Sequence, residues 1–96
     1  MREQLLITTL FDYYGHLLTE KQIKYFKDYY FDNLSLSEMS ENYNISRNAI
    51  HKNIKDSLEK LKYYEKQLEL IKKRDKIKKI ITNLDDDIKN KIMDLI

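Results

Sequence analysis

The chain has no proline and a single glycine in 96 residues, and this scarcity constrains its fold more than any other feature. Hairpins and tight loops depend on glycine and proline, because these two residues permit or preset the backbone angles of sharp turns. Leu, Lys, Glu and Ile instead supply long stretches without a helix breaker. The sequence therefore predicts an all-α fold with one compact core and, at most, a helical extension.

Apolar periodicity and capping signals define the first two helices. The first is expected from about Arg2 to Leu17, with an inward face made of Leu6, Leu10, Tyr13, Tyr14 and Leu17. A T-x-x-Q capping box, Thr19 to Gln22, starts the second helix. That helix should end near residues 31–33, where short polar side chains compete for the backbone, and its inward face is Ile23, Phe26 and Tyr30.

Two further helices meet at a short turn. Ser35 and Glu38 form an S-x-x-E capping box at the start of the third helix, which should end at about Tyr43 with Leu36 and Met39 facing inward. Asn44 occupies the position of a left-handed turn residue, and Ser46 caps the fourth helix. The fourth helix is the longest periodic stretch, a rod of roughly 35 to 40 Å, with apolar positions Ile50, Ile54, Leu58, Leu61, Tyr64, Leu68 and Ile71.

The segment after this rod should supply apolar surface for its far end. Two short helical candidates are Lys76 to Ile81 and Asp86 to Ile96, and a second copy of the chain is the alternative. Acidic side chains favour helix N-termini. We therefore interpret Asp85, Asp86 and Asp87 as cap and dipole partners rather than a metal cluster. The expected division is residues 1–62, a helix-turn-helix domain, and residues 63–96, a helical extension for dimerisation or partner binding.

The third and fourth helices together predict a helix-turn-helix at about residues 35 to 61. Ser40 is small where the helices approach, Asn44 allows the turn, and Ile45 and Ile50 pack beneath it. Side chains left on or beside the outward face are those a major-groove reader uses, Arg for guanine, Asn for adenine and Lys for phosphate. They are Arg47, Asn48, His51, Lys52 and Lys55. The alternative is an ordinary corner of a helical bundle with a solvated polar face.

Basic charge is concentrated in one segment. Residues 46–79 carry twelve Lys or Arg against five Asp or Glu, whereas residues 1–45 carry four against seven and residues 80–96 two against four. Such a concentration is typical of a phosphate-binding surface, although lysines on a solvated helix face need no partner. Its densest stretch begins with Lys72, Lys73 and Arg74, which could serve RNA as readily as DNA.

Four stretches resemble the bacterial YlxM family, also described as signal recognition particle-associated proteins. They read LFDYY at residues 10–14, LLTEKQ at 17–22, YYFDNLSLSE at 29–38 and ISRNAIHKNIK at 45–55. The resemblance covers roughly the first 70 residues, with one departure, because the family's Asp-Leu pair is here Asp32-Asn33-Leu34. It implies a helix-turn-helix similar to region four of bacterial sigma factors, grouped with winged-helix-like domains, and a regulatory role in the signal recognition particle pathway.

An enzyme is not expected. The chain has no cysteine nucleophile and no Gly-rich phosphate loop, and His16 and His51 stand in unrelated contexts. We expect no cofactor and no metal. The first residues lack the apolar run of a signal peptide, and no stretch has the roughly 18 to 20 apolar residues of a membrane span. A soluble, cytoplasmic protein is therefore expected.

Three functions remain open from the sequence. The chain could read DNA, bind RNA such as that of the signal recognition particle, or act as a protein adaptor for the particle's GTPases. Asp56 and Glu59 interrupt the basic face of the fourth helix, which weakens the DNA interpretation without excluding it. We expect a homodimer that pairs through the outer fourth helix and the residues after it. The alternative is a monomer whose tail folds back on that helix.

Overall fold

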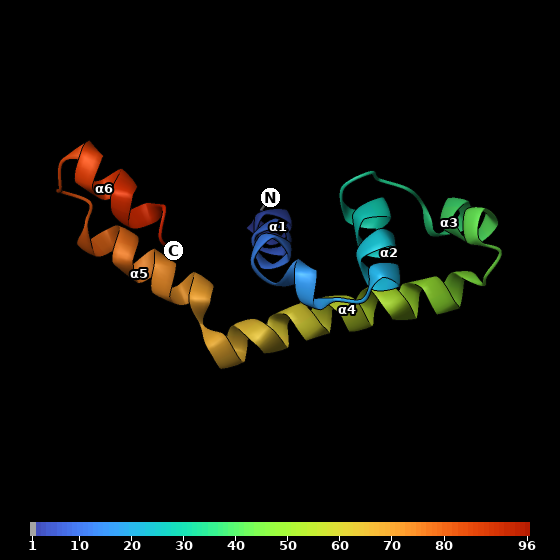
Figure 1. Ribbon diagram of the computed structural model, residues 1–96. Helices are drawn as coiled ribbons and strands as arrows, with labels where there is room; N and C mark the ends of the chain where they lie inside the picture. Colours follow the sequence, from blue (N-terminus) through green and yellow to red (C-terminus); the bar gives the residue numbers. More distant parts are fainter. Residues whose placement is uncertain (1) are drawn as a thin grey trace.

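The computed structural model describes residues 2–96 as a series of helices (Figure 1). In chain order they are α1 (Arg2–Tyr14), the 3-10 helix η1 (Gly15–Leu17), α2 (Glu20–Tyr30), α3 (Leu36–Tyr43), α4 (Arg47–Leu68), α5 (Leu70–Ile80) and α6 (Asp86–Met93). The described chain contains no strand, so the predicted all-α fold is confirmed. The expected likeness to winged-helix domains does not extend to a wing, because a wing is a β-hairpin and residues 2–96 contain no strand.

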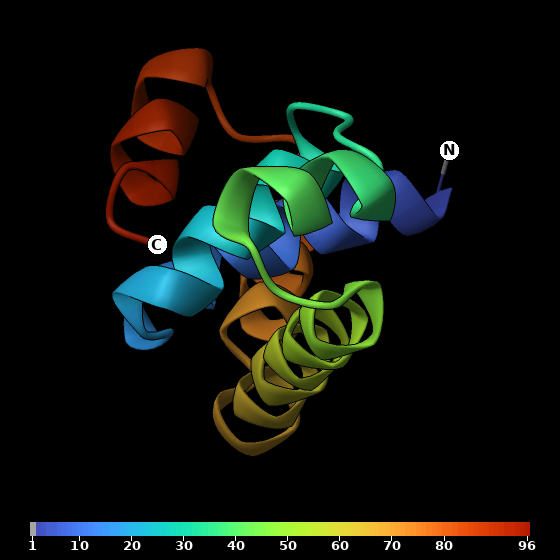
Figure 2. The same cartoon turned by 90° about the vertical axis from the view of Figure 1, so that its right-hand side faces the viewer.

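Helix α4 is the base on which the N-terminal helices rest. Figure 1 shows α1, α2 and α3 arranged in turn along its length, and Figure 2 shows α4 receding beneath them from the α3 end. Each of the three packs directly on α4. The 22 residues of α4 confirm the predicted long helix. One half of it carries the helix-turn-helix, and the other half carries α1.

The inward face of the first helix differs in part from the prediction, although Leu10 and Tyr14 are buried as predicted. Helix α1 ends at Tyr14, and the chain tightens into η1, where the Leu18 amide donates to the Gly15 carbonyl at 3.0 Å. Leu6 and Leu17, both predicted to face inward, are 47% and 43% exposed, whereas Ile7 and Leu18 are buried. A methyl group on Gly15 would lie 2.9 Å from the Phe11 ring, so the chain's one glycine permits this close turn.

The apolar core has two parts that meet along α4. The first is centred on the α1 contact and contains Ile7, Leu10, Tyr14, Leu18, Phe26, Leu61 and Ile71. The second lies under the helix-turn-helix and contains Tyr25, Met39, Ile50 and Ile54. The predicted division falls between residues 62 and 63, and the α1 core contains Leu61 from one side of it and Ile71 from the other. The division into two domains stays a prediction.

The long helix breaks earlier than its apolar periodicity indicates. Periodicity predicts that α4 continues through Ile71, but Glu69 adopts a left-handed conformation, with φ 55° and ψ 30°, and α5 starts at Leu70. The predicted segment from Lys76 is thus the second half of a helix that starts six residues earlier. The turn aims Ile71 into the α1 core instead of along the α4 stripe.

Helices α5 and α6 form a C-terminal arm, defined as residues 70–96. Figure 1 shows the arm extending beyond the end of α4, with α6 folded back beside α5 and not on α4. Its presence lengthens the molecule to 53 × 24 × 22 Å and raises the radius of gyration to 16.7 Å, compared with about 13 Å for a compact domain of similar length. Asp85 accepts the Asp87 amide at 2.8 Å, which confirms its predicted capping role.

Candidate nucleic-acid interface

Local hydrogen bonds build the turn that presents α4. Ser35 and Glu38 satisfy each other's backbone amides at 3.0 and 3.1 Å, as the S-x-x-E motif predicts. Asn44 is left-handed, with φ 53° and ψ 44°, which confirms it as the turn residue. Ser40 donates its hydroxyl to the Ile45 carbonyl at 2.6 Å, and Ser46 accepts the Ala49 amide at 3.1 Å. The start of α4 is thus fixed relative to α3.

Packing beneath the turn holds the two helices in place. Met39 of α3 and Ile50 of α4 have no exposed surface, and Tyr25 of α2 lies beside them. The Tyr25 ring is 4.8 Å from the Tyr43 ring, whose hydroxyl donates to Asp28. Because α2, α3 and α4 share this core, the outward face of α4 is a rigid surface, a requirement for precise contact with a ligand.

The structure brings the five predicted residues of α4 together on one exposed surface. We call them the reader surface, and all are solvent-exposed, namely Arg47, Asn48, His51, Lys52 and Lys55. Buried Ile50 and Ile54 face the core from the same two turns. This separation follows from the 3.6-residue helical repeat. Grouping of these side chains confirms their predicted placement, whereas their contact with nucleic acid stays a prediction.

Two reader residues already have polar partners. The Arg47 guanidinium donates to the Ser37 hydroxyl at 3.3 Å, so α3 steadies its position. Lys52 pairs with Asp56 at 2.7 Å, and this hydrogen bond and the charge of Asp56 raise the pKa of Lys52. The pair is exposed and weakly bound, so a phosphate can displace the carboxylate at little cost.

The basic residues of α5 are not part of the reader surface. Lys72, Lys73 and Arg74 lie just beyond the C-terminal end of α4, while the reader surface begins at its N-terminal end (Figure 1). A helix of this length separates them by roughly 30 Å. Arg74 is partly buried, pairs with Asp75 at 3.1 Å and lies 5.4 Å above the Tyr13 ring. Its guanidinium therefore links α5 to α1, whereas Lys72 and Lys73 are exposed.

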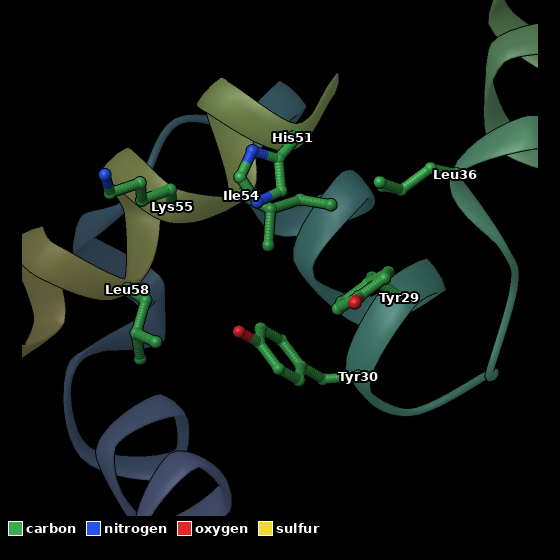
Figure 3. Close-up of a pocket in the computed structure, with 7 residues that line it drawn as sticks. All are labelled: Tyr29, Tyr30, Leu36, His51, Ile54, Lys55 and Leu58. Carbon is green, nitrogen blue, oxygen red and sulfur yellow. The ribbon is translucent and has the colours of Figure 1, made fainter. Parts of the chain in front are cut away.

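The structure also reveals a small cavity that the sequence analysis missed. It lies beside the reader surface, measures about 150 Å³, and is lined by Tyr29, Tyr30, Leu36, His51, Ile54, Lys55 and Leu58. Figure 3 shows the two tyrosines of α2 facing the α4 side chains across it. Sequence periodicity predicts only that Tyr30 faces inward, and it predicts no role for Tyr29. No short motif marks this cavity, because three helices contribute to it.

Within residues 2–96, no three His, Cys, Asp or Glu side chains gather as a metal site would require. No helix of that part of the chain is long and apolar enough to cross a membrane.

The capped third helix, the left-handed Asn44 and the exposed start of α4 define a protein of the helix-turn-helix class. A family model described as "Putative helix-turn-helix protein, YlxM / p13 like" matches residues 1–95. The chain belongs to this family, which confirms the resemblance drawn from its sequence motifs.

Individual relatives agree with the family match. A UPF0122 protein of Malacoplasma penetrans is 51% identical over 65 residues, covering 68% of this chain and 61% of the relative. Those of Halalkalibacterium halodurans and Listeria monocytogenes are each 45% identical, and cover 78% and 79% of this chain. The chain spans 61% of the first relative's length and 69% of each of the other two.

Proposed function

We propose that this protein binds nucleic acid through the reader surface of α4. The observation that carries the proposal is the exposure of Arg47, Asn48, His51, Lys52 and Lys55 together on a helix that the α2 and α3 core holds rigid. Arg and Asn can make paired hydrogen bonds to guanine and adenine edges, while Lys neutralises phosphate.

Acidic neighbours limit how much of α4 can enter a groove. Asp56 and Glu59 are exposed on the turns that follow the reader surface. Negative charge there repels phosphate. The contact is therefore confined to the first two or three turns of α4, with Lys55 at its far end. A helix-turn-helix reader likewise uses the N-terminal residues of its second helix.

A double variant tests the proposal. Arg47→Ala with Lys52→Ala should weaken binding to DNA and RNA and make the dependence of log K on log salt shallower by up to about 2, since each phosphate contact contributes roughly 0.7 to 0.9. The matched control is Lys89→Ala with Lys91→Ala, which removes the same charge from α6. Melting temperature should change little in both variants, because Arg47, Lys52 and Lys91 are exposed and Lys89 is only partly covered. Equal affinities for the two variants would contradict the proposal.

Proposals for the protein's role and partners rest on the family resemblance and on the basic charge of the arm. We propose a regulatory role linked to the signal recognition particle, with its RNA or its GTPases as partners. Lys72 and Lys73 offer a second basic patch, about one α4 length from the reader surface. Two separated patches suit a folded RNA or a ribonucleoprotein as well as they suit duplex DNA. A pull-down from lysate with and without nuclease separates a nucleic-acid tether from direct protein contact.

We also propose that two copies pair through the arm. Its exposed apolar side chains include Leu70, Ile80, Leu84, Ile88, Leu95 and Ile96. Helix α6 has no buried residue, and Ile71 is the one buried residue of α5. Soluble monomers seldom leave large contiguous apolar patches in water. A second copy would cover these side chains and place two reader surfaces on one assembly.

A further inference from the structure

We propose that the cavity beside the reader surface, termed the slot, holds the base of an unpaired nucleotide. The inference rests on the proposed function, and it narrows the ligand from nucleic acid in general to one with an unstacked base, in a bulge, a loop or a single strand. The slot lies between Tyr29 and Tyr30 of α2, Leu36 of α3, and the side of α4 that carries His51 and Lys55 (Figure 3).

The tyrosines offer a rigid aromatic surface to solvent. Tyr29 is 36% exposed, and its ring meets the Tyr30 ring edge to face at 5.0 Å and 82°. Tyr30 packs in turn on the fully buried Phe26 ring at 4.7 Å. Phe26 stacks on Phe11 at 5.0 Å. Because this chain of ring contacts fixes Tyr29 before any ligand arrives, stacking a base on it would cost little conformational entropy.

The rim of the slot is basic. His51 and Lys55 line it from α4, and within residues 2–96 neither side chain is in an ion pair. Figure 3 shows the Lys55 ammonium extending away from the tyrosines, so the aliphatic stem lines the slot while the charge faces outward. An aromatic wall beside a lysine matches the two parts of a nucleotide, a flat base and its phosphate.

The dimensions of the slot select one ring and not a duplex. Its volume of about 150 Å³ is smaller than the roughly 300 to 1,000 Å³ of pockets that enclose a whole small molecule. Bases inside a duplex have both faces covered by their neighbours, so only an unpaired or extruded base can stack on Tyr29. The reader surface would hold the adjoining backbone, and the slot would take a base beside it.

The test uses the full chain and four hairpins, in RNA and in DNA, each either fully paired or with one bulged 2-aminopurine. The wild-type protein should bind the bulged hairpin more tightly and quench the probe's fluorescence, because a stacked 2-aminopurine is dim. Tyr29→Leu should lower affinity for the bulged hairpin by about fivefold to 160-fold, the range for losing one stacked base, and should abolish quenching. Tyr29→Phe keeps the ring and should retain both properties. Comparison of the RNA and DNA hairpins shows which nucleic acid supplies the nucleotide.

The outcomes separate this inference from the proposed function. Equal affinity for paired and bulged hairpins, unchanged by Tyr29→Leu, would overturn the slot assignment and leave the slot to an apolar side chain of a protein partner. The proposed function would survive that result if Arg47→Ala with Lys52→Ala still weakened binding. Absence of binding to every hairpin would overturn both. Circular dichroism of Tyr29→Leu checks its fold, and Lys55→Ala provides a second variant, which should weaken binding without abolishing the quenching.

Discussion

The Tyr14 hydroxyl donates to the Glu65 carboxylate at 2.6 Å, across 51 positions of the chain. The same hydroxyl accepts the Leu70 amide at 3.2 Å, and the carboxylate accepts the amides of Ile71 and Lys72 at 3.0 and 3.2 Å. Helix α5 has no side-chain cap from Glu69 itself. Glu65 therefore caps α5 from the last turns of α4, and Tyr14 ties this cap to α1.

This network predicts that Tyr14 and Glu65 act together in holding the arm. Tyr14→Phe removes a hydrogen bond to a charged group and should lower the free energy of unfolding by about 1.5 to 3 kcal/mol. Glu65→Gln should cost a similar amount, and the double variant less than the sum, with a coupling of about 0.5 to 3 kcal/mol. Urea unfolding of the wild type, the two single variants and the double variant measures this coupling free energy. Amide hydrogen exchange at Ile71 and Lys72 should also accelerate.

Glu59→Gln is the matched control for these variants, because Glu59 is an exposed acid of the same helix. It should change stability by less than about 0.5 kcal/mol. Additive effects of Tyr14→Phe and Glu65→Gln, with unchanged exchange at the start of α5, would show that the contact does not orient the arm.

Alkaline pH should destabilise the protein through Tyr14. Burial, followed by the hydrogen bond to Glu65, raises the pKa of Tyr14 from 10.0 to about 12. The folded protein then holds this proton where the unfolded chain has lost it. Stability is fully present below pH 10 and declines as pH rises toward about 12, by up to about 1.4 kcal/mol per pH unit.

Urea unfolding between pH 9 and pH 11 measures this decline, and Tyr14→Phe should make it shallower. Some slope should remain, since burial and the hydrogen bond to Asp28 also raise the pKa of Tyr43 to about 12. An identical slope in the wild type and Tyr14→Phe would mean that the phenol of Tyr14 ionises in the folded protein as it does in the unfolded chain.

The core under the helix-turn-helix should be sensitive to truncation. Ile50 is fully buried and Ile54 is 4% exposed, so Ile50→Ala or Ile54→Ala should cost on the order of 2 to 5 kcal/mol. Leu5, which is 68% exposed on α1, provides the control, and Leu5→Ala should cost less than about 0.5 kcal/mol. Thermal and urea unfolding decide the result. A loss below about 1 kcal/mol at both isoleucines would mean that α4 is rotated relative to this core.

Local signals allowed much of this fold to be predicted from sequence. The caps at Thr19, Ser35 and Ser46 involve residues within three positions of one another, so their motifs specify their hydrogen bonds directly. Asn44 is similar, because its own side chain makes the left-handed turn accessible. Periodicity alone predicted the buried positions Ile50, Ile54 and Leu61 of α4, but not the buried Ser57.

Features that depend on distant residues could not be predicted in this way. Glu69 is a poor residue for a left-handed turn, and the turn is stabilised by Tyr14 from the other end of the sequence. Leu6 and Ile7 lie four and three residues before Leu10, so periodicity fits either, and the choice depends on which side of α1 the core around Leu61 and Ile71 covers. The slot needs three helices in place before Tyr29 and Lys55 share a cavity.

Dimerisation through the arm gives the last prediction. Light scattering at micromolar concentration should give a mass near twice 11.7 kDa, and Leu68→Glu should halve it, since Leu68 is 46% exposed where α4 meets the arm. Burying a carboxylate in an apolar interface is strongly unfavourable. Leu17→Glu is the matched control, because Leu17 has a similar exposure of 43% and lies in η1, outside residues 70–96, and it should leave the mass unchanged. A wild-type mass near 11.7 kDa would rule out the dimer. The reader surface and the slot would then belong to a monomer. Affinity for a nucleic acid with two target sites would equal that for one site, because avidity requires two linked surfaces.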